Sequence, residues 1–234
     1  MEEKFPFGKA LIVGAGPGLS AALARKLTGL GVEVCLAARN PAKLAPFAKE
    51  IGAATFAVDA SDAHQVAALF AEVAGRGGDP DVVVYNPSQR TQGRLVDLDP
   101  ATVETAIRIT AFGAFLVVQQ AAKRMVPKGH GAILLTGATA GVKGFARSAA
   151  FAMGKFALRG LAQSAARELG PQGIHVAHVV VDGGIRSATR PEPADKPDSM
   201  LDPDAIAASY WHVVQQPRSA WTWEVELRPW VERF

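Results

Sequence analysis

A glycine-rich turn near the N-terminus constrains the fold of this chain more than any other feature. Ala10–Val13 is a short apolar run typical of a buried strand, and from Leu19 onward leucines recur every three or four residues, as in a helix. Gly14, Gly16 and Gly18 lie between these two segments. A strand, a tight glycine turn and a helix N-terminus bring unpaired backbone N–H groups to one point. That arrangement suits the pyrophosphate of a dinucleotide.

The glycine spacing is one residue short of either standard dinucleotide-binding pattern. In the Gly-x-Gly-x-x-Gly fingerprint the third glycine falls on Leu19. In the alternative Gly-x3-Gly-x-Gly spacing, Gly14 and Gly18 match but Ser20 replaces the last glycine. Both interpretations place the phosphates at the same turn, where Gly16 leaves room for them to approach.

Length and hydropathy limit the class of protein. A chain of 234 residues has about the size of one α/β domain with a full core, and we expect a single domain over residues 1–234. No apolar run approaches the roughly 20 residues needed to span a bilayer. Met1–Gly8 lacks the continuous apolar core of a secretory signal. We therefore expect a soluble, cytoplasmic protein with no membrane partner.

Charge and cysteine content narrow the class further. The 25 basic residues are scattered among 22 acidic ones and form no basic stripe, so we expect no nucleic-acid partner. Cys35 lies in an apolar run and has no second cysteine to pair with. That pattern suits a reducing compartment and an inert, buried thiol. We expect no metal site.

Apolar runs alternate with helical patterns along the chain. The expected strands cover residues 10–13, 32–38, 55–58, 81–85, 132–136 and 175–181, with an edge strand near 221–227. The longest expected helices cover 100–125 and 151–169, and the expected helix caps are Asp62 or Ser61, Asp99 and Asp202. Strands joined by helices of about ten or more residues form right-handed crossovers. The pattern predicts an α/β fold of the Rossmann type, a doubly wound parallel sheet of about seven strands flanked by helices.

Residues that follow the second and third strands indicate which cofactor the turn binds. An acidic residue after the second strand would hold the ribose 2′-hydroxyl of NAD. Arg39 stands there instead, and its planar cation suits a 2′-phosphate, although it can also be a solvated arginine at a helix start. Asp59, followed by Ala60, either closes a turn or accepts a hydrogen bond from the adenine amino group. We predict NADP in preference to NAD.

Several ordered pieces of the sequence together resemble the short-chain dehydrogenase/reductase family over roughly residues 8–187. They are the glycine turn, Tyr85–Ser88 where the family has Asn-Asn-Ala-Gly, Thr136–Gly141 after the fifth strand, Lys155, and Asp182–Ser187 after the sixth strand. The resemblance implies an NAD(P)-dependent oxidoreductase that acts on a carbonyl or alcohol group of a small-molecule substrate.

The catalytic positions of that family are largely replaced in this sequence. The family's proton donor is the tyrosine of a Tyr-x3-Lys pair, in which both side chains share a helix face and the ammonium lowers the pKa of the phenol. Phe151 occupies the tyrosine position before Lys155. Ala138 occupies the serine position, and Thr110 the asparagine position. The chain resembles a branch of the family that carries phenylalanine beside the retained lysine.

The resemblance also implies roles for the remaining site residues. Lys155 is expected to hydrogen-bond the nicotinamide ribose, although it can also be a lysine that extends from its helix to solvent. Asn86 is expected at a strand end below the adenosine side of the cofactor. Gly183 and Ile185 are expected near the nicotinamide amide. Thr139, beside the lost serine, either donates one hydrogen bond in the site or caps a turn.

Two functions agree with this pattern. One is an NADP-dependent oxidoreductase whose proton comes from water, the substrate or a displaced donor, the candidates being Thr139, Ser148, Tyr210 and His212. The last two require that the proline-rich segment 186–215, expected to be a mobile loop and a short helix, folds over the site. The other function is a catalytically inactive nucleotide-binding or scaffolding protein.

The resemblance further implies a homodimer or homotetramer. The family assembles through its fourth and fifth helices, here about 100–125 and 151–169. The apolar positions that suit such a contact are Phe112, Phe115, Phe156 and Leu161. The same four side chains can also face the sheet.

Overall fold

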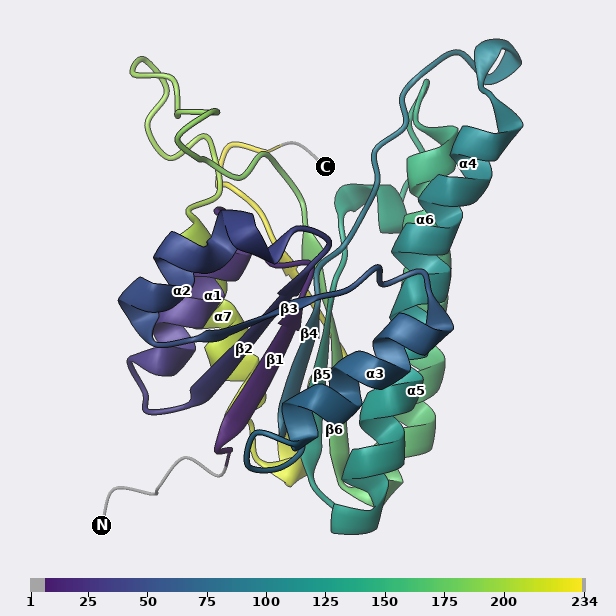
Figure 1. The fold of residues 1–234 in the computed structure, drawn as a ribbon. Helices are drawn as coiled ribbons and strands as arrows, with labels where there is room; N and C mark the ends of the chain where they lie inside the picture. The colour runs from purple at the N-terminus through teal and green to yellow at the C-terminus, as the bar shows by residue number, and fades with distance from the viewer. Residues whose placement is uncertain (1–6, 233–234) are drawn as a thin grey trace.

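In the computed structural model, which describes residues 7–232, seven strands form one parallel sheet (Figure 1). The strand order is β3-β2-β1-β4-β5-β6-β7. Their bounds are β1 Lys9–Val13, β2 Glu33–Ala38, β3 Ala54–Ala57, β4 Val82–Tyr85, β5 Gly131–Thr136, β6 Ile174–Val181 and β7 Glu224–Leu227. This is the α/β sheet that the sequence predicts. The expectation about Met1–Gly8 falls largely outside the described residues.

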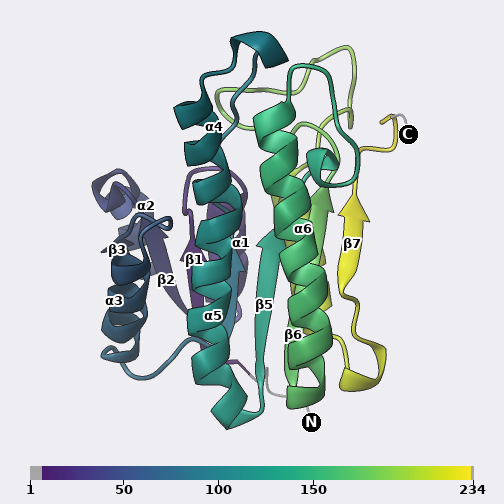
Figure 2. The same ribbon diagram turned by 90° about the vertical axis from the view of Figure 1, so that its right-hand side faces the viewer.

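Helices cover both faces of the sheet (Figures 1 and 2). One face carries α1 (Leu19–Thr28), α2 (Ala45–Ile51) and α7 (Pro203–Val214). The other carries α3 (Ala63–Ala74), α4 (Pro100–Ile107), α5 (Gly113–Met125) and α6 (Ala149–Leu169). Short 3-10 turns cover Pro41–Leu44, Leu95–Asp97, Val126–Lys128, Thr139–Gly141, Gly170–Gln172 and Arg218–Ala220. Because two cores enclose the sheet, its inner strands are apolar along their length.

Side-chain caps fix the starts of three helices. Asp62, Asp99 and Asp202 each accept hydrogen bonds from backbone N–H groups of the following turn, at 2.8 to 3.0 Å. Pro100 and Pro203 occupy the first helical position, where the missing N–H costs no hydrogen bond. These helices therefore begin where the sequence predicts.

The long helix before β5 contains one π-helical turn, Arg108–Phe112, between α4 and α5. The Tyr85 hydroxyl, at the end of β4, donates a hydrogen bond to the Ile109 carbonyl within this turn. The next residue, Gly113, packs so closely on the sheet that a Cβ there would lie 2.5 Å from the Tyr85 hydroxyl oxygen. A helix carbonyl bound by a side chain and a close backbone approach are the local causes of the widened turn.

The outer edge of the sheet is tied to α6 by a charged cluster. Arg159 of α6 donates two hydrogen bonds to the Glu224 carboxylate on β7, both at 2.7 Å. The same carboxylate lies 2.9 Å from the Nδ1 atom of His178, which is fully buried on β6. The cluster connects the last two strands to the helix that packs across them.

One helical run is long and apolar enough to cross a membrane by length and composition alone. It covers Pro100–Lys128, 29 residues, in the described part of the chain. The core helix of a soluble protein passes the same test, and α5 packs its buried side chains into one of the two cores. The sequence expectation concerned unbroken apolar runs, and polar residues such as Arg108 and Gln119 interrupt this helix. The absence of a membrane partner stays a prediction.

Replacing Gly113 by alanine is expected to lower the free energy of unfolding by about 1 to 3 kcal/mol, because the added methyl group collides with Tyr85 and a neighbouring carbonyl. Gly160 in α6 is the matched control, since a Cβ there meets no neighbouring element within 4 Å. Gly160→Ala should raise stability by about 0.5 to 1 kcal/mol through helix propensity. Urea unfolding measures both changes, and equal effects would contradict the packing described.

Candidate functional site

Two adjoining cavities open at the carboxyl ends of the strands and share Asn86 and Ser88. The first, the glycine-turn cavity, has a volume of about 640 Å³ and follows the ends of β1, β2 and β3. The second, the Phe151 cavity, has a volume of about 580 Å³ and follows the ends of β5 and β6. The chain runs outward from β1 in one direction and from β4 in the other, and ligands bind at such switch points of open α/β sheets.

The glycine turn is built around Gly14. Its φ of +79° lies in the left-handed region, and a Cβ there would lie 2.6 Å from the backbone nitrogen of Pro87. Gly16 and Gly18 have no such neighbour within 4 Å, so they leave open space beside the N-terminus of α1. Leu19, in contrast, buries its side chain in the core. The turn thus provides backbone N–H groups and room, and Leu19 contributes no side chain to the cavity.

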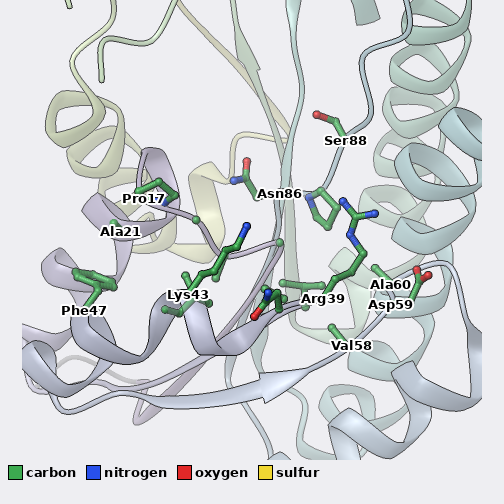
Figure 3. Close-up of a pocket in the computed structure, with 18 of the residues that line it drawn as sticks. Pro17, Ala21, Arg39, Lys43, Phe47, Val58, Asp59, Ala60, Asn86 and Ser88 are labelled. Atoms are coloured by element: carbon green, nitrogen blue, oxygen red, sulfur yellow. The ribbon is translucent and has the colours of Figure 1, made fainter. Parts of the chain in front are cut away.

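Two cationic side chains extend into the glycine-turn cavity (Figure 3). Arg39 follows β2 and Lys43 lies in the next turn, and both line the cavity. Neither forms an ion pair within residues 7–232. Arg25 lines the edge but lies over the Phe47 ring, at 5.6 Å from its centroid. Sequence reasoning missed Lys43, whose one signal is that it is a second cation shortly after the end of the second strand.

Asp59 lies where β3 ends, with Ala60, and both line the glycine-turn cavity. One carboxylate oxygen of Asp59 accepts hydrogen bonds from the N–H and the hydroxyl of Ser61, at 2.9 and 2.7 Å. Asp59 therefore closes the turn, as one of the two sequence interpretations states. Its contact with an adenine stays a prediction.

Asn86 connects the two cavities and fixes the turn. Its N–H donates to the Val13 carbonyl at 3.0 Å, and its side-chain amide donates to the Ser20 hydroxyl at 2.8 Å. That hydroxyl in turn donates to the Gly14 carbonyl at 3.2 Å. Asn86 thus lies at a strand end, where the sequence places it, and holds β4 against the start of α1.

Lys155 is the cation most deeply buried in the Phe151 cavity. Only 2 % of its surface is exposed, and its ammonium donates a hydrogen bond of 2.7 Å to the Thr136 carbonyl. Burial, and then the neighbouring charge of Arg90, lower the pKa of Lys155 to about 7. The alternative of a lysine that extends to solvent is wrong.

Phe151 and Ala138 line this cavity at the positions where the family that the sequence resembles has a tyrosine and a serine, so neither position provides a hydroxyl group. The Phe151 ring lies one helical turn before Lys155, with 5.9 Å between the ring centroid and the ammonium nitrogen. On the same ring, the Arg90 guanidinium carbon lies 5.0 Å from the centroid. Ala138 lines the cavity, and Thr110 is buried in the π-helical turn. An aromatic ring that two cations approach therefore occupies the place of the expected proton donor.

Two of the four displaced proton donors considered from sequence lie in the Phe151 cavity. Thr139 and Ser148 both line it, and the Thr139 hydroxyl donates to the Asp182 carboxylate. Tyr210 and His212 line neither cavity, since α7 packs on the opposite face of the sheet. Tyr210 is 1 % exposed within that second core. These last two residues are thus excluded as donors by their position.

The chain after β6 forms the far wall of the Phe151 cavity. Gly183, Ile185 and Arg190 line it beside Asp182, which has an ion pair of 3.3 Å with Arg228. Gly183 has a φ of +147°, and a Cβ there would lie 2.8 Å from a proline ring of the C-terminal segment. The loop of the segment 186–215 therefore reaches the site through Arg190, whereas its helix does not.

Other reactive groups lie outside the two cavities or do not converge. Burial raises the pKa of the Cys35 thiol to about 11, so the thiol is protonated and inert at neutral pH, as predicted. Within residues 7–232, no group of three or more His, Cys, Asp or Glu side chains is placed to hold a metal ion.

A doubly wound parallel sheet with a cavity at a glycine turn defines a dinucleotide-binding class of α/β proteins. Within that class, the chain belongs to the short chain dehydrogenase family, whose sequence profile matches residues 8–196. This finding confirms the family that the sequence resembles.

Solved structures agree with the family. A short-chain dehydrogenase from Rhodopseudomonas palustris is 33% identical, with a TM-score of 0.82, over 95% of this chain and 99% of that one. A metagenomic short-chain oxidoreductase solved in complex with NADP is 30% identical, with a TM-score of 0.83, over 95% and 97%.

Curated relatives are similar over most of their length. An uncharacterized oxidoreductase of Staphylococcus aureus strain MW2 is 26% identical over 226 residues, which cover 94% of this chain and 96% of the relative. A short-chain dehydrogenase/reductase of Armillaria gallica is 33% identical over 177 residues, 71% of this chain and 67% of the relative.

The lowered pKa of Lys155 predicts that the free energy of unfolding depends on pH. Its pKa of about 7 lies below its ordinary value of 10.5, so between these pH values the unfolded chain binds more protons than the folded one. The contribution of Lys155 to the free energy of unfolding therefore rises with pH in this window. Lys155→Met removes that contribution, and the wild type should gain stability relative to the variant between about pH 7 and about pH 9.5. Urea unfolding at both pH values tests this, and a constant difference would contradict the lowered pKa.

Proposed function

We propose that this chain is an NADP(H)-dependent oxidoreductase that lacks the family's tyrosine and serine hydroxyls and acts on a carbonyl or alcohol group of a small molecule. The glycine-turn cavity with the free cations Arg39 and Lys43 carries the proposal. The sequence has no carboxylate directly after β2 that would bind the ribose 2′-hydroxyl of NAD. The NADP complex of the metagenomic relative supports the same cofactor for this chain.

The residues around the cavities fit such a cofactor. Gly16 and Gly18 leave open space for a pyrophosphate beside the ten-residue helix α1, whose first N–H groups point toward the turn. Arg39 and Lys43 would hold the 2′-phosphate. The remaining contacts would come from Asp59 and Ala60 at the adenine, Asn86 below the adenosine, Lys155 at the nicotinamide ribose, and Gly183 and Ile185 at the nicotinamide amide.

The bound nicotinamide would supply or accept a hydride, and the chain has to provide or remove a proton. Phe151 has no proton to transfer, and the Thr139 hydroxyl is already donated to Asp182. Lys155, with a pKa of about 7, carries a transferable proton near neutral pH. We infer that Lys155 donates that proton, directly or through water, in place of the phenol.

A second candidate is a nucleotide-binding or scaffolding protein without catalysis. The observation that favours it is the loss of three hydroxyl or amide groups at once, at Phe151, Ala138 and Thr110. Removal of a general acid lowers a rate by about 10²- to 10⁴-fold, which corresponds to roughly 3 to 5 kcal/mol of barrier. NADPH binding without oxidation across a panel of ketones, enones and imines would select this candidate.

We also propose that the protein is a cytoplasmic, single-domain homodimer or homotetramer. Phe112, Phe115 and Phe156 support assembly, because each is more than 40 % exposed. Leu161 instead packs against the core, so it does not belong to this exposed set. Light scattering that shows a monomer would reject the assembly.

Cofactor choice is tested by Arg39→Ser. The Kd for NADPH should rise by about 10- to 100-fold, because a charge-assisted hydrogen bond to the 2′-phosphate is lost. The Kd for NADH, which lacks that phosphate, should change little. Lys49→Ser, an exposed lysine of α2 that does not line the cavity, is the control. Calorimetry measures both constants, and equal losses for the two cofactors would refute the assignment.

Restoring the tyrosine and serine hydroxyl groups tests whether their loss limits the rate of turnover. The double variant Phe151→Tyr with Ala138→Ser should reduce ketones about 10²- to 10⁴-fold faster than the wild type with NADPH, because a phenol would again lie beside Lys155. Phe115→Tyr is the control, because this exposed phenylalanine of α5 lines neither cavity and its replacement should leave the rate unchanged. If the double variant binds NADPH but gains no rate, Phe151 is not the position that limits turnover.

A further inference from the structure

The lining of the Phe151 cavity has an excess of positive charge. Its cationic side chains are Arg90, Lys143, Lys155 and Arg190. Its two carboxylates are Asp182 and Glu232. Of these, Asp182 is already neutralised, because it pairs with Arg228 at 3.3 Å and accepts the Thr139 hydroxyl. The cavity therefore favours a negatively charged ligand.

Two of the cations rest on aromatic rings. The Arg90 guanidinium lies over Phe151, and the Lys143 ammonium lies over Phe145 at 5.7 Å from the ring centroid. Within residues 7–232, neither forms an ion pair with a carboxylate. A guanidinium held over a ring by a cation–π contact still has N–H groups free for hydrogen bonds to an oxyanion.

Lys155 approaches the same ring as Arg90. Its ammonium has three donors, and in the described residues its one hydrogen bond goes to the Thr136 carbonyl. A buried ammonium with donors to spare is stabilised by a nearby anion. Arg90 and Lys155 thus form a pair of donors around the Phe151 ring.

We propose that the Phe151 cavity binds an oxyanion of the substrate between Arg90 and Lys155, over the ring of Phe151. The substrate class is then an oxo acid or hydroxy acid whose carboxylate, or phosphate, occupies this position. Phenylalanine provides a platform for the guanidinium and the ligand, where tyrosine would place a hydroxyl. The substrate class rests on the proposed function, whereas binding of the anion does not.

Calorimetry on the full chain tests the proposal, with benzoate, phenyl phosphate and uncharged benzamide as probes, each with and without NADPH. An anion should bind at least about tenfold more tightly than benzamide, and Arg90→Met should weaken it by about 10- to 100-fold. Arg90 lies in an exposed loop, so the variant should fold, and Arg90→Lys keeps the charge if it does not. Arg167→Met is the control, since this exposed arginine of α6 lines neither cavity.

Preference between benzoate and phenyl phosphate identifies the oxyanion as a carboxylate or a phosphate. Equal affinity for benzamide, no effect of Arg90→Met, or an equal effect of Arg167→Met overturns the proposal. The NADPH titration in the same samples reports separately on the proposed function. NADPH binding without anion binding refutes only the substrate class, and anion binding without NADPH binding refutes only the cofactor.

Discussion

The close packing of Gly14 against Pro87 is the constraint on which the site depends. These residues follow β1 and β4, which are adjacent in the sheet, and no side chain larger than hydrogen fits between them. The chain can therefore leave the two strands in opposite directions while their ends stay together. Asn86 reinforces the arrangement through Ser20. The glycine-turn cavity opens beside this contact, and Asn86, the residue before Pro87, also lines the Phe151 cavity.

Most of the fold could be predicted from sequence because its signals are local. The strands of a parallel sheet buried on both faces appear in the sequence as short apolar runs. An aspartate followed by a proline marks the start of two of the helices. The π-helical turn at Arg108–Phe112 could not be predicted, because the Tyr85 hydroxyl that binds a carbonyl within it comes from a distant strand. The position of α7 could not be predicted either. Its sequence pattern indicates that one side of the helix is apolar, but not on which side of the sheet the helix packs.

The site was predictable to the extent that strand ends converge. Arg39, Asp59 and Asn86 each follow a parallel strand, and such ends share one edge of the sheet. The environment of the Phe151 ring was not predictable, because Arg90 comes from an irregular loop that carries no periodic signal. The hydrogen bond that holds Lys155 goes to a backbone carbonyl, and sequence gives no sign of such an acceptor.

The cluster of Arg159, Glu224 and His178 connects the edge of the sheet to elements that line the Phe151 cavity. Arg159 lies one helical turn beyond Lys155 on α6, and its two hydrogen bonds to Glu224 join that helix to β7. His178 also presses on Gly137, whose Cβ position would lie 2.3 Å from the imidazole, and Gly137 is part of the cavity wall. The C-terminal strand β7 is thus linked, through Arg159 and His178, to the helix and the loop that line the Phe151 cavity.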